Sequence, residues 1–169
     1  MDPEYFEQLA MPLFDQLYNF AHWLTGAQAD AEDLVQETYA RALKGFDSFA
    51  AGTDLRAWMY RILRNTFLTS RSGLAAKRTT SLEDDIEEPV SAELTPELLL
   101  LRQEGRATVL GALAVLPVDS REVLLLFEME EMSYREIAEV LGVPIGTVMS
   151  RLSRARKMMR LVLAPKGER

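Results

Sequence analysis

The stretch Ser133–Arg160, which reads SYREIAEVLGVPIGTVMSRLSRARKMMR, carries the strongest fold signal in this 169-residue chain. Ser133 and Glu136 have the spacing of a capping box, in which each side chain satisfies a backbone N–H at the start of a helix. An apolar stripe follows, and Gly142 then supplies the left-handed turn that commonly ends a helix. The pattern predicts a short helix with a defined beginning and a defined end.

A second helix is expected to start near Pro144. Its Val148 would pack against the first helix, where Ala138 is small enough to allow a close crossing. The spacing of Ala138, Gly142 and Val148 fits a helix-turn-helix.

The second helix would present a polar face on which every charged side chain is basic. Recognition helices of this kind contact base edges near their N-terminal end and hold phosphates with arginine and lysine. A solvated basic helix on an interaction module is the alternative interpretation. The residues expected to contact DNA are Thr147, Ser150, Arg151, Ser153, Arg154, Arg156 and Lys157.

Charge is unevenly distributed along the chain, whose net charge is −7. Residues 144–169 carry 7 basic side chains and 1 acidic one, whereas residues 1–143 carry 12 basic and 25 acidic ones. Residues 55–82 hold six basic side chains and no acidic one, and residues 79–101 hold seven acidic ones and no basic one. Such blocks usually mark separate contact surfaces, although solvated helix faces and an acidic linker would look similar.

Several classes of protein are disfavoured. The chain has no cysteine and a single histidine, His22, which we expect to be packed rather than catalytic. We find no glycine-rich phosphate loop, metal-ligand spacing or nucleophile–base signature, so we expect no enzyme, no metal and no cofactor. No apolar run approaches the length of a membrane span, and the acidic start lacks a signal-peptide pattern. We therefore expect a cytoplasmic protein without membrane insertion.

Helical periodicity predicts an all-α fold of two small domains. Helices are expected over residues 4–24, 30–43, 54–67, 96–115 and 119–127. In the third of these helices, an apolar stripe that includes Trp58 would face the core. Arg56, Tyr60, Arg61 and Arg64 would lie on the other side. The predicted domains are residues 1–75 and 96–169, joined by a flexible acidic linker over residues 76–95, although the helical periodicity already breaks at Ser70.

Taken together, the motifs resemble those of extracytoplasmic-function (ECF) sigma factors, the smallest sigma subunits of bacterial RNA polymerase. Residues 30–39, DAEDLVQETY, are similar to the region 2 helix that grips the polymerase clamp. Residues 55–66, LRAWMYRILRNT, resemble the −10 recognition segment. Leu116-Pro117 with residues 121–123, and then residues 133–138, resemble region 4, and residues 144–156 resemble its −35 recognition helix.

The resemblance implies a protein that binds core RNA polymerase and promoter DNA, with an anti-sigma factor as a further partner. It implies polymerase contacts from Asp33, Gln36 and Glu37. It also implies −10 contacts, in which residues 65–69 align with the family loop that can capture a flipped base. Asn65 could instead be an ordinary helix cap. The implied −10 residues are Arg61, Arg64, Asn65, Thr66 and Arg71.

Two other functions fit parts of the pattern. A helix-turn-helix transcription regulator would bind a palindrome as a dimer, and a sigma-like decoy would sequester an anti-sigma factor. One residue departs from the family pattern, because Met149 stands where some members have lysine or arginine. A thioether cannot make a charged contact with DNA, so the −35 sequence is left open.

Overall fold

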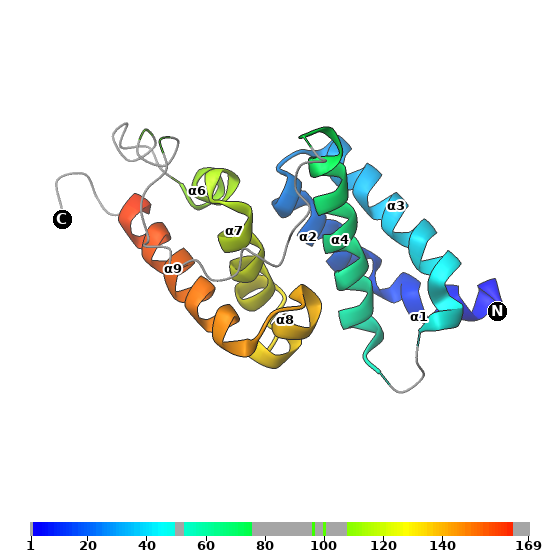
Figure 1. Cartoon of the computed structure of the whole chain (residues 1–169). Helices are drawn as coiled ribbons and strands as arrows, with labels where there is room; N and C mark the ends of the chain where they lie inside the picture. Colours follow the sequence, from blue (N-terminus) through cyan, green and yellow to red (C-terminus); the bar gives the residue numbers. More distant parts are fainter. Residues whose placement is uncertain (1, 50–52, 76–95, 97–99, 101–107, 164–169) are drawn as a thin grey trace.

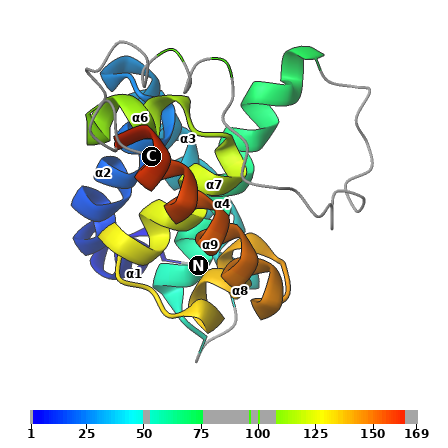
Figure 2. The same cartoon turned by 90° about the vertical axis from the view of Figure 1, so that its left-hand side faces the viewer.

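The computed structural model describes residues 2–49, 53–75, 96, 100 and 108–163, and the predicted linker over residues 76–95 lies outside them. The secondary structure in these ranges is helical, without strands, which confirms the predicted all-α class. Figures 1 and 2 show an N-terminal half, formed by α1 to α4, beside a C-terminal half, formed by α6 to α9. The elements are α1 (Pro3–Ala10), η1 (Met11–Leu13), α2 (Phe14–Thr25), α3 (Gln28–Gly45), η2 (Phe46–Ser48), α4 (Leu55–Ala75), α6 (Val109–Val115), α7 (Val118–Leu124), η4 (Leu125–Met129), α8 (Tyr134–Leu141) and α9 (Ile145–Leu163).

The first predicted helix, over residues 4–24, is interrupted. A 3₁₀ turn, η1, separates α1 from α2, and Pro12 is its central residue. Proline lacks the backbone N–H that an α-helix needs and its ring crowds the preceding turn, so a continuous helix was the wrong expectation. The predicted end is confirmed, because α2 stops at Thr25 and Gly26 adopts a φ of 81°.

Helix α4 begins as expected and continues further than expected. The Arg56 backbone N–H donates a 3.0 Å hydrogen bond to Asp54 Oδ1, so Asp54 caps the start of the helix. The helix runs through Ser70 to Ala75, so the break in periodicity at Ser70 does not end it. Tyr60, which was placed on the outer face, is fully buried.

The helix expected over residues 96–115 is not continuous, because Thr108 is extended and its Oγ1 accepts a 3.0 Å hydrogen bond from the Gly111 backbone N–H. This cap starts α6 at Val109. Pro117 separates α6 from α7, which begins at Val118, one residue before the expected start at residue 119. Helix α7 passes directly into η4, a single π-helical turn.

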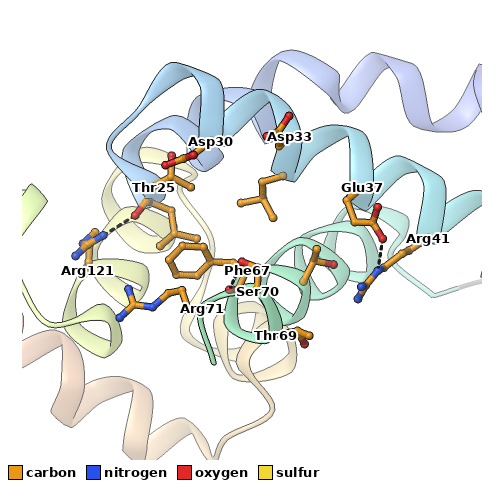
Figure 3. A pocket seen from close by; sticks show the side chains of 13 residues that line it. Thr25, Asp30, Asp33, Glu37, Arg41, Phe67, Thr69, Ser70, Arg71 and Arg121 are labelled. Carbon is orange, nitrogen blue, oxygen red and sulfur yellow. Dashed lines mark hydrogen bonds and ion pairs between the residues drawn. The ribbon is translucent and has the colours of Figure 1, made fainter. Parts of the chain in front are cut away.

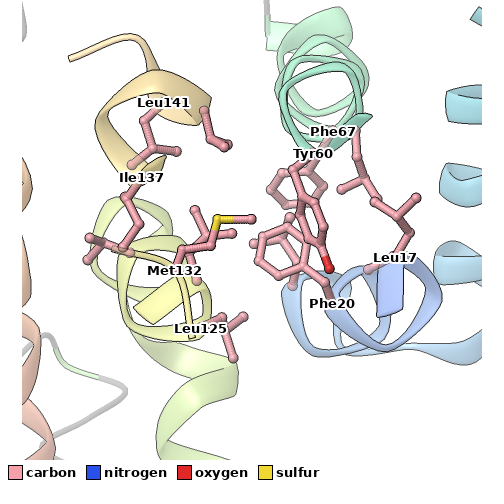
Figure 4. Close-up of a cluster of buried hydrophobic side chains, with 14 of the residues drawn as sticks. Leu17, Phe20, Tyr60, Phe67, Leu125, Met132, Ile137 and Leu141 are labelled. Atoms are coloured by element: carbon pink, nitrogen blue, oxygen red, sulfur yellow. The ribbon is translucent and has the colours of Figure 1, made fainter. Parts of the chain in front are cut away.

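One hydrophobic core extends across both halves. Tyr60 and Phe20 from the N-terminal half belong to the same buried cluster as Met132, Ile137 and Leu141 from the C-terminal half. Figure 4 shows these two groups of side chains facing each other, with Met132 between them. The packing of α4 against α8 therefore places the predicted −10 segment directly beside the helix-turn-helix.

Candidate nucleic-acid interface

The turn of the helix-turn-helix is well formed. The Ser133 backbone N–H donates to Glu136 Oε1 at 2.8 Å, and the Glu136 backbone N–H donates to Ser133 Oγ at 3.1 Å, which confirms the capping box. Gly142 has a φ of 70°, and its N–H donates a 2.8 Å hydrogen bond to the carbonyl of Ala138. The direction in which α9 leaves the turn is therefore fixed by local hydrogen bonds.

Helix α9 has a buried stripe and an open polar face. Val148, Leu152 and Ala155 are buried, as the spacing predicted for Val148. Ser150, Ser153 and Lys157 are exposed, and Thr147 and Arg154 are half-buried. Met149 is also exposed, so its thioether is accessible beside this polar face. These side chains form the surface that could enter a DNA groove.

Arg156 does not belong to that face. Its Nη2 lies 3.0 Å from Glu128 Oε2, and its guanidinium lies 5.0 Å from the centre of the Phe127 ring. Because nine residues span two and a half helical turns, Arg156 is on the side of α9 opposite Thr147. This placement favours a packing role within the C-terminal half and does not favour the predicted DNA contact.

Two of the three predicted −10 arginines lie next to the C-terminal half, Arg64 partly buried and Arg61 exposed. Arg64 donates hydrogen bonds to both carboxylate oxygens of Glu122, from Nε at 3.1 Å and from Nη2 at 3.2 Å. Its Nη1 donates to the Leu141 carbonyl at 3.3 Å. Arg61 lies beside the turn, since a Cβ at Gly142 would lie 3.8 Å from Arg61 Nη2. In this arrangement the −10 segment faces α8 and the turn that follows it.

The other predicted −10 residues lie within a helix rather than in a loop. Asn65 is exposed in the middle of α4, so it is not a helix cap. Thr66 is buried, and its Oγ1 donates a 2.7 Å hydrogen bond to the Ile62 carbonyl of its own helix. Arg71 is exposed, with its guanidinium 5.4 Å from the centre of the Phe67 ring. Capture of a base by residues 65–69 would therefore use one face of α4.

Two aromatic predictions have different outcomes. Trp58 packs against the core, 5.1 Å from the Phe49 ring centre, which agrees with a packing role. His22 is exposed, and its ring centre lies 6.3 Å from that of Tyr18 and 6.3 Å from that of Trp23, so its packing is limited to neighbours on its own helix.

The predicted polymerase-binding residues share an exposed face of α3. Asp33, Gln36 and Glu37 have spacings of three and four residues, which bring side chains together on a helix. Asp33 and Glu37 line a cleft of about 680 Å³ between α3 and α4, and Glu37 Oε2 lies 2.8 Å from Arg41 Nε. Figure 3 shows this cleft, with Asp33 and Glu37 on one wall. Gln36 lines a separate groove with Phe14 and Tyr39.

Arg121 closes one end of the same cleft. It is 9% exposed and donates to the carbonyls of Leu24, Ala114 and Leu116. Burial lowers the pKa of Arg121, and the nearby positive charge of Arg71 lowers it further. The bond to Leu24 joins the C-terminal half to the end of α2, where helix carbonyls favour a cation.

Reasoning from the sequence missed four residues that hold the halves together, namely Tyr60, Arg121, Glu122 and Glu130. Tyr60 donates a 2.6 Å hydrogen bond to Glu130 Oε1, and Arg56 donates to the Glu130 carbonyl. Burial raises the pKa of Glu122 and of Glu130, and the arginine partner of each opposes this rise. The sequence contained one signal for buried charge, because Arg121 and Glu122 directly precede the apolar run over residues 123–126. This pattern did not indicate which residues the two side chains would contact.

The described ranges contain no candidate membrane span and no candidate metal site. No helix there is long and apolar enough to cross a membrane. No group of three or more histidine, aspartate or glutamate side chains is arranged to hold a metal ion in that part of the chain.

Comparisons with known proteins match the two halves separately. Residues 9–76 match the family described as Sigma-70 region 2, and residues 106–159 match the family described as Sigma-70, region 4. These ranges contain the helices that carry the predicted −10 and −35 residues.

Full-length relatives cover nearly the whole chain. It is 35% identical to the ECF RNA polymerase sigma factor SigE of Mycolicibacterium smegmatis, covering 94% of this chain and 64% of the relative. It is 36% identical to the ECF RNA polymerase sigma factor EcfG of Rhodopseudomonas palustris, with 93% and 90% covered. The sigma factor RpoE of Bartonella quintana, solved in complex with the anti-sigma factor NepR, aligns with a TM-score of 0.71 at 31% identity, covering 98% and 99%.

Proposed function

Since the chain belongs to the family of ECF RNA polymerase sigma factors, we propose that it binds core RNA polymerase and directs the enzyme to promoters with paired −35 and −10 elements. One observation carries the proposal. A correctly formed turn presents the polar face of α9, with Thr147, Ser150, Arg151, Ser153, Arg154 and Lys157, beside a buried stripe that anchors the helix. Arginine and lysine on such a face supply the phosphate contacts that position a recognition helix.

The other contacts are divided between the two faces of the N-terminal half. We assign −10 recognition to α4 through Arg61, Arg64, Asn65, Thr66 and Arg71. Polymerase binding falls to Asp33, Gln36 and Glu37 on α3. The domain boundaries that follow are residues 1–75 and 96–169. This division needs two DNA-contacting surfaces on one chain, and the two basic stretches of an otherwise acidic protein supply them.

The polymerase, not this chain, would supply the chemistry, so we assign it no enzymatic activity, and we place it in the cytoplasm where transcription occurs. An anti-sigma factor is the further partner that we propose, because the Bartonella quintana relative is in complex with one. The net charge of −7 opposes binding to DNA, so we expect the chain without polymerase to bind promoters weakly.

Run-off transcription with purified core polymerase, followed by mapping of the start sites, tests the proposal. The expected result is a discrete set of transcripts that require the chain, each preceded by shared −35 and −10 sequences. A housekeeping sigma factor on the same templates controls for active polymerase. No transcript and no binding to core polymerase would overturn the proposal.

The outcome of that experiment also separates the alternatives. A helix-turn-helix regulator would bind a palindrome as a dimer without polymerase. A decoy would bind an anti-sigma factor and leave core polymerase free.

A further inference from the structure

One face of the −10 helix is covered by the C-terminal half in this structure. Figure 1 shows α4 beside α8, and their apolar side chains share one cluster (Figure 4). Arg64 points at Glu122 and Leu141, so one of the three arginines assigned to −10 recognition is held against protein, whereas Arg61 and Arg71 are exposed. DNA could reach the Arg64 guanidinium only if the halves moved apart.

Glu122 is the most deeply buried acidic residue at this boundary, with no exposed surface. A carboxylate taken out of water is very unfavourable unless a positive charge lies close to it. In this structure the bidentate bond from Arg64, which belongs to the other half, provides that charge. Glu122 itself sits on α7, so separation of the halves would remove its partner.

A second partner for Glu122 is present within its own half. The positive charge of Arg151 on α9 also lowers the pKa of Glu122, more weakly than that of Arg64. Arg151 Nη1 is buried and has no hydrogen-bond partner among the described residues. The Glu122 carboxylate therefore has two arginines near it. It is hydrogen-bonded to Arg64 of the −10 helix, whereas Arg151 of the −35 helix has a buried Nη1 without a partner.

We propose that Glu122 is a switch residue that holds the two halves closed through Arg64 and pairs with Arg151 once the halves separate. The closed arrangement is autoinhibitory, because it covers Arg64. Opening releases Arg64 for DNA and, in the same step, gives Arg151 a partner that fixes its position on α9. The functional meaning of this exchange rests on the proposed sigma activity, but the exchange itself is a property of the free chain.

Exchange of partners makes opposite predictions for the two arginines. The Arg64 contact exists only in the closed state, so Arg64→Ala should favour the open state. The Arg151 contact with Glu122 forms in the open state, so Arg151→Ala should favour the closed state. Removing one partner of a buried ion pair typically shifts an equilibrium by about 150- to 5,000-fold. We expect about tenfold for Arg64→Ala, because Arg151 can take its place.

The absence of cysteine allows a direct measurement on the free chain. Ala40→Cys on α3 and Arg135→Cys on α8 place dyes on exposed positions in the two halves. Energy transfer between the dyes should fall in Arg64→Ala and rise or stay maximal in Arg151→Ala. In a background partly opened by mild denaturant, the rise with Arg151→Ala should be measurable. Arg41→Ala, which breaks an exposed ion pair within the N-terminal half, is the matched control and should change nothing.

Unchanged energy transfer in Arg64→Ala would overturn the proposal, as would a shift in the same direction for both arginine variants. Far-UV circular dichroism on each variant shows whether the helices are intact. Arg64→Lys, which keeps the charge but not the bidentate geometry, keeps the test interpretable if Arg64→Ala unfolds. Neither polymerase nor DNA is present, so a chain that directs transcription but fails this test leaves the proposed function standing.

Discussion

The hydroxyl of Tyr60 donates a 2.6 Å hydrogen bond to Oε1 of Glu130, which lies 70 positions further along the chain. Tyr60 is fully buried, and its ring packs edge-on against Phe20 with centres 5.2 Å apart. The bond therefore joins the two halves at a point where water has little access, and where a lost donor would not be replaced.

Tyr60→Phe should lower the free energy of unfolding by about 1–3 kcal/mol, since the ring packing is kept while a largely buried carboxylate loses a donor. Chemical denaturation followed by circular dichroism measures the change. Tyr5→Phe at a half-exposed position is the control and should stay within about 0.5 kcal/mol. Equal stability of the two variants would mean that the Tyr60 bond contributes nothing.

Gly142→Ala should destabilise the protein by about 1–2 kcal/mol, because its φ of 70° disfavours any side chain. The space around it is not the obstacle, as an added Cβ would meet only Arg61 Nη2 at 3.8 Å. Gly146→Ala is the matched control, because Gly146 is helical and a Cβ there meets nothing within 4 Å. Thermal unfolding of both variants is the measurement, and a stable Gly142→Ala protein would contradict the role given to the turn.

Arg154→Ala should weaken binding of the polymerase complex to promoter DNA by about 1–3 kcal/mol if it contacts a base, and should reduce the salt dependence if it contacts phosphate. Arg156→Ala should have a smaller effect, because Arg156 is paired with Glu128 on the other side of α9. Filter binding at several salt concentrations separates these cases. Core polymerase binding should be unchanged in both variants, and an equal loss of it would contradict the assignment of α9 to DNA.

Asp33→Ala should reduce the affinity for core polymerase several-fold, because Asp33 is an exposed acid on the α3 face assigned to that contact. Asp15→Ala, at another exposed acidic position on α2, is the control for the change in net charge. Fluorescence titration with labelled core polymerase gives both affinities. If the two variants bind alike, the contact face lies elsewhere on the molecule.

The raised pKa of Tyr39 leads us to expect that the protein loses stability at alkaline pH. Burial raises the pKa of Tyr39 to about 12, and its hydroxyl donates a 2.7 Å hydrogen bond to the Ala10 carbonyl. An unfolded tyrosine ionises near pH 10, so the folded state holds this proton more tightly. The stabilisation is therefore fully present below about pH 10 and is lost as the pH rises towards 12.

Tyr39→Phe should remove that part of the pH dependence, and Tyr5→Phe should leave it in place. Denaturation curves between neutral and alkaline pH measure the difference, and the tyrosinate absorbance that the wild type gains and Tyr39→Phe lacks reports ionisation of the Tyr39 ring. Identical slopes for the wild type and Tyr39→Phe would show that another group controls alkaline unfolding.

The features predicted correctly from the sequence depend on neighbours in the chain. The Ser133–Glu136 capping box, the left-handed Gly142 and the buried Val148 all follow from spacings of a few residues. Local chemistry also contained one signal that was overlooked, since Pro12 alone predicts a break between α1 and α2.

The contacts between the halves could not be predicted in the same way. Helical periodicity places Tyr60 and Arg64 opposite the apolar stripe of α4, and that face would be solvated in an isolated domain. Their partners, Glu130 and Glu122, are 70 and 58 positions away. Which surfaces meet depends on the shape of the complete molecule, and no spacing along the chain encodes it.

The shared hydrophobic core has a consequence for any protein that separates the halves. Parting would bring Tyr60, Met132 and Leu141 into contact with water, so the open chain would be prone to self-association. A partner that separates the two halves must therefore cover the newly exposed apolar surface as it binds. Its apparent affinity for the intact chain will be lower than for either half alone, by the fraction of molecules that are already open.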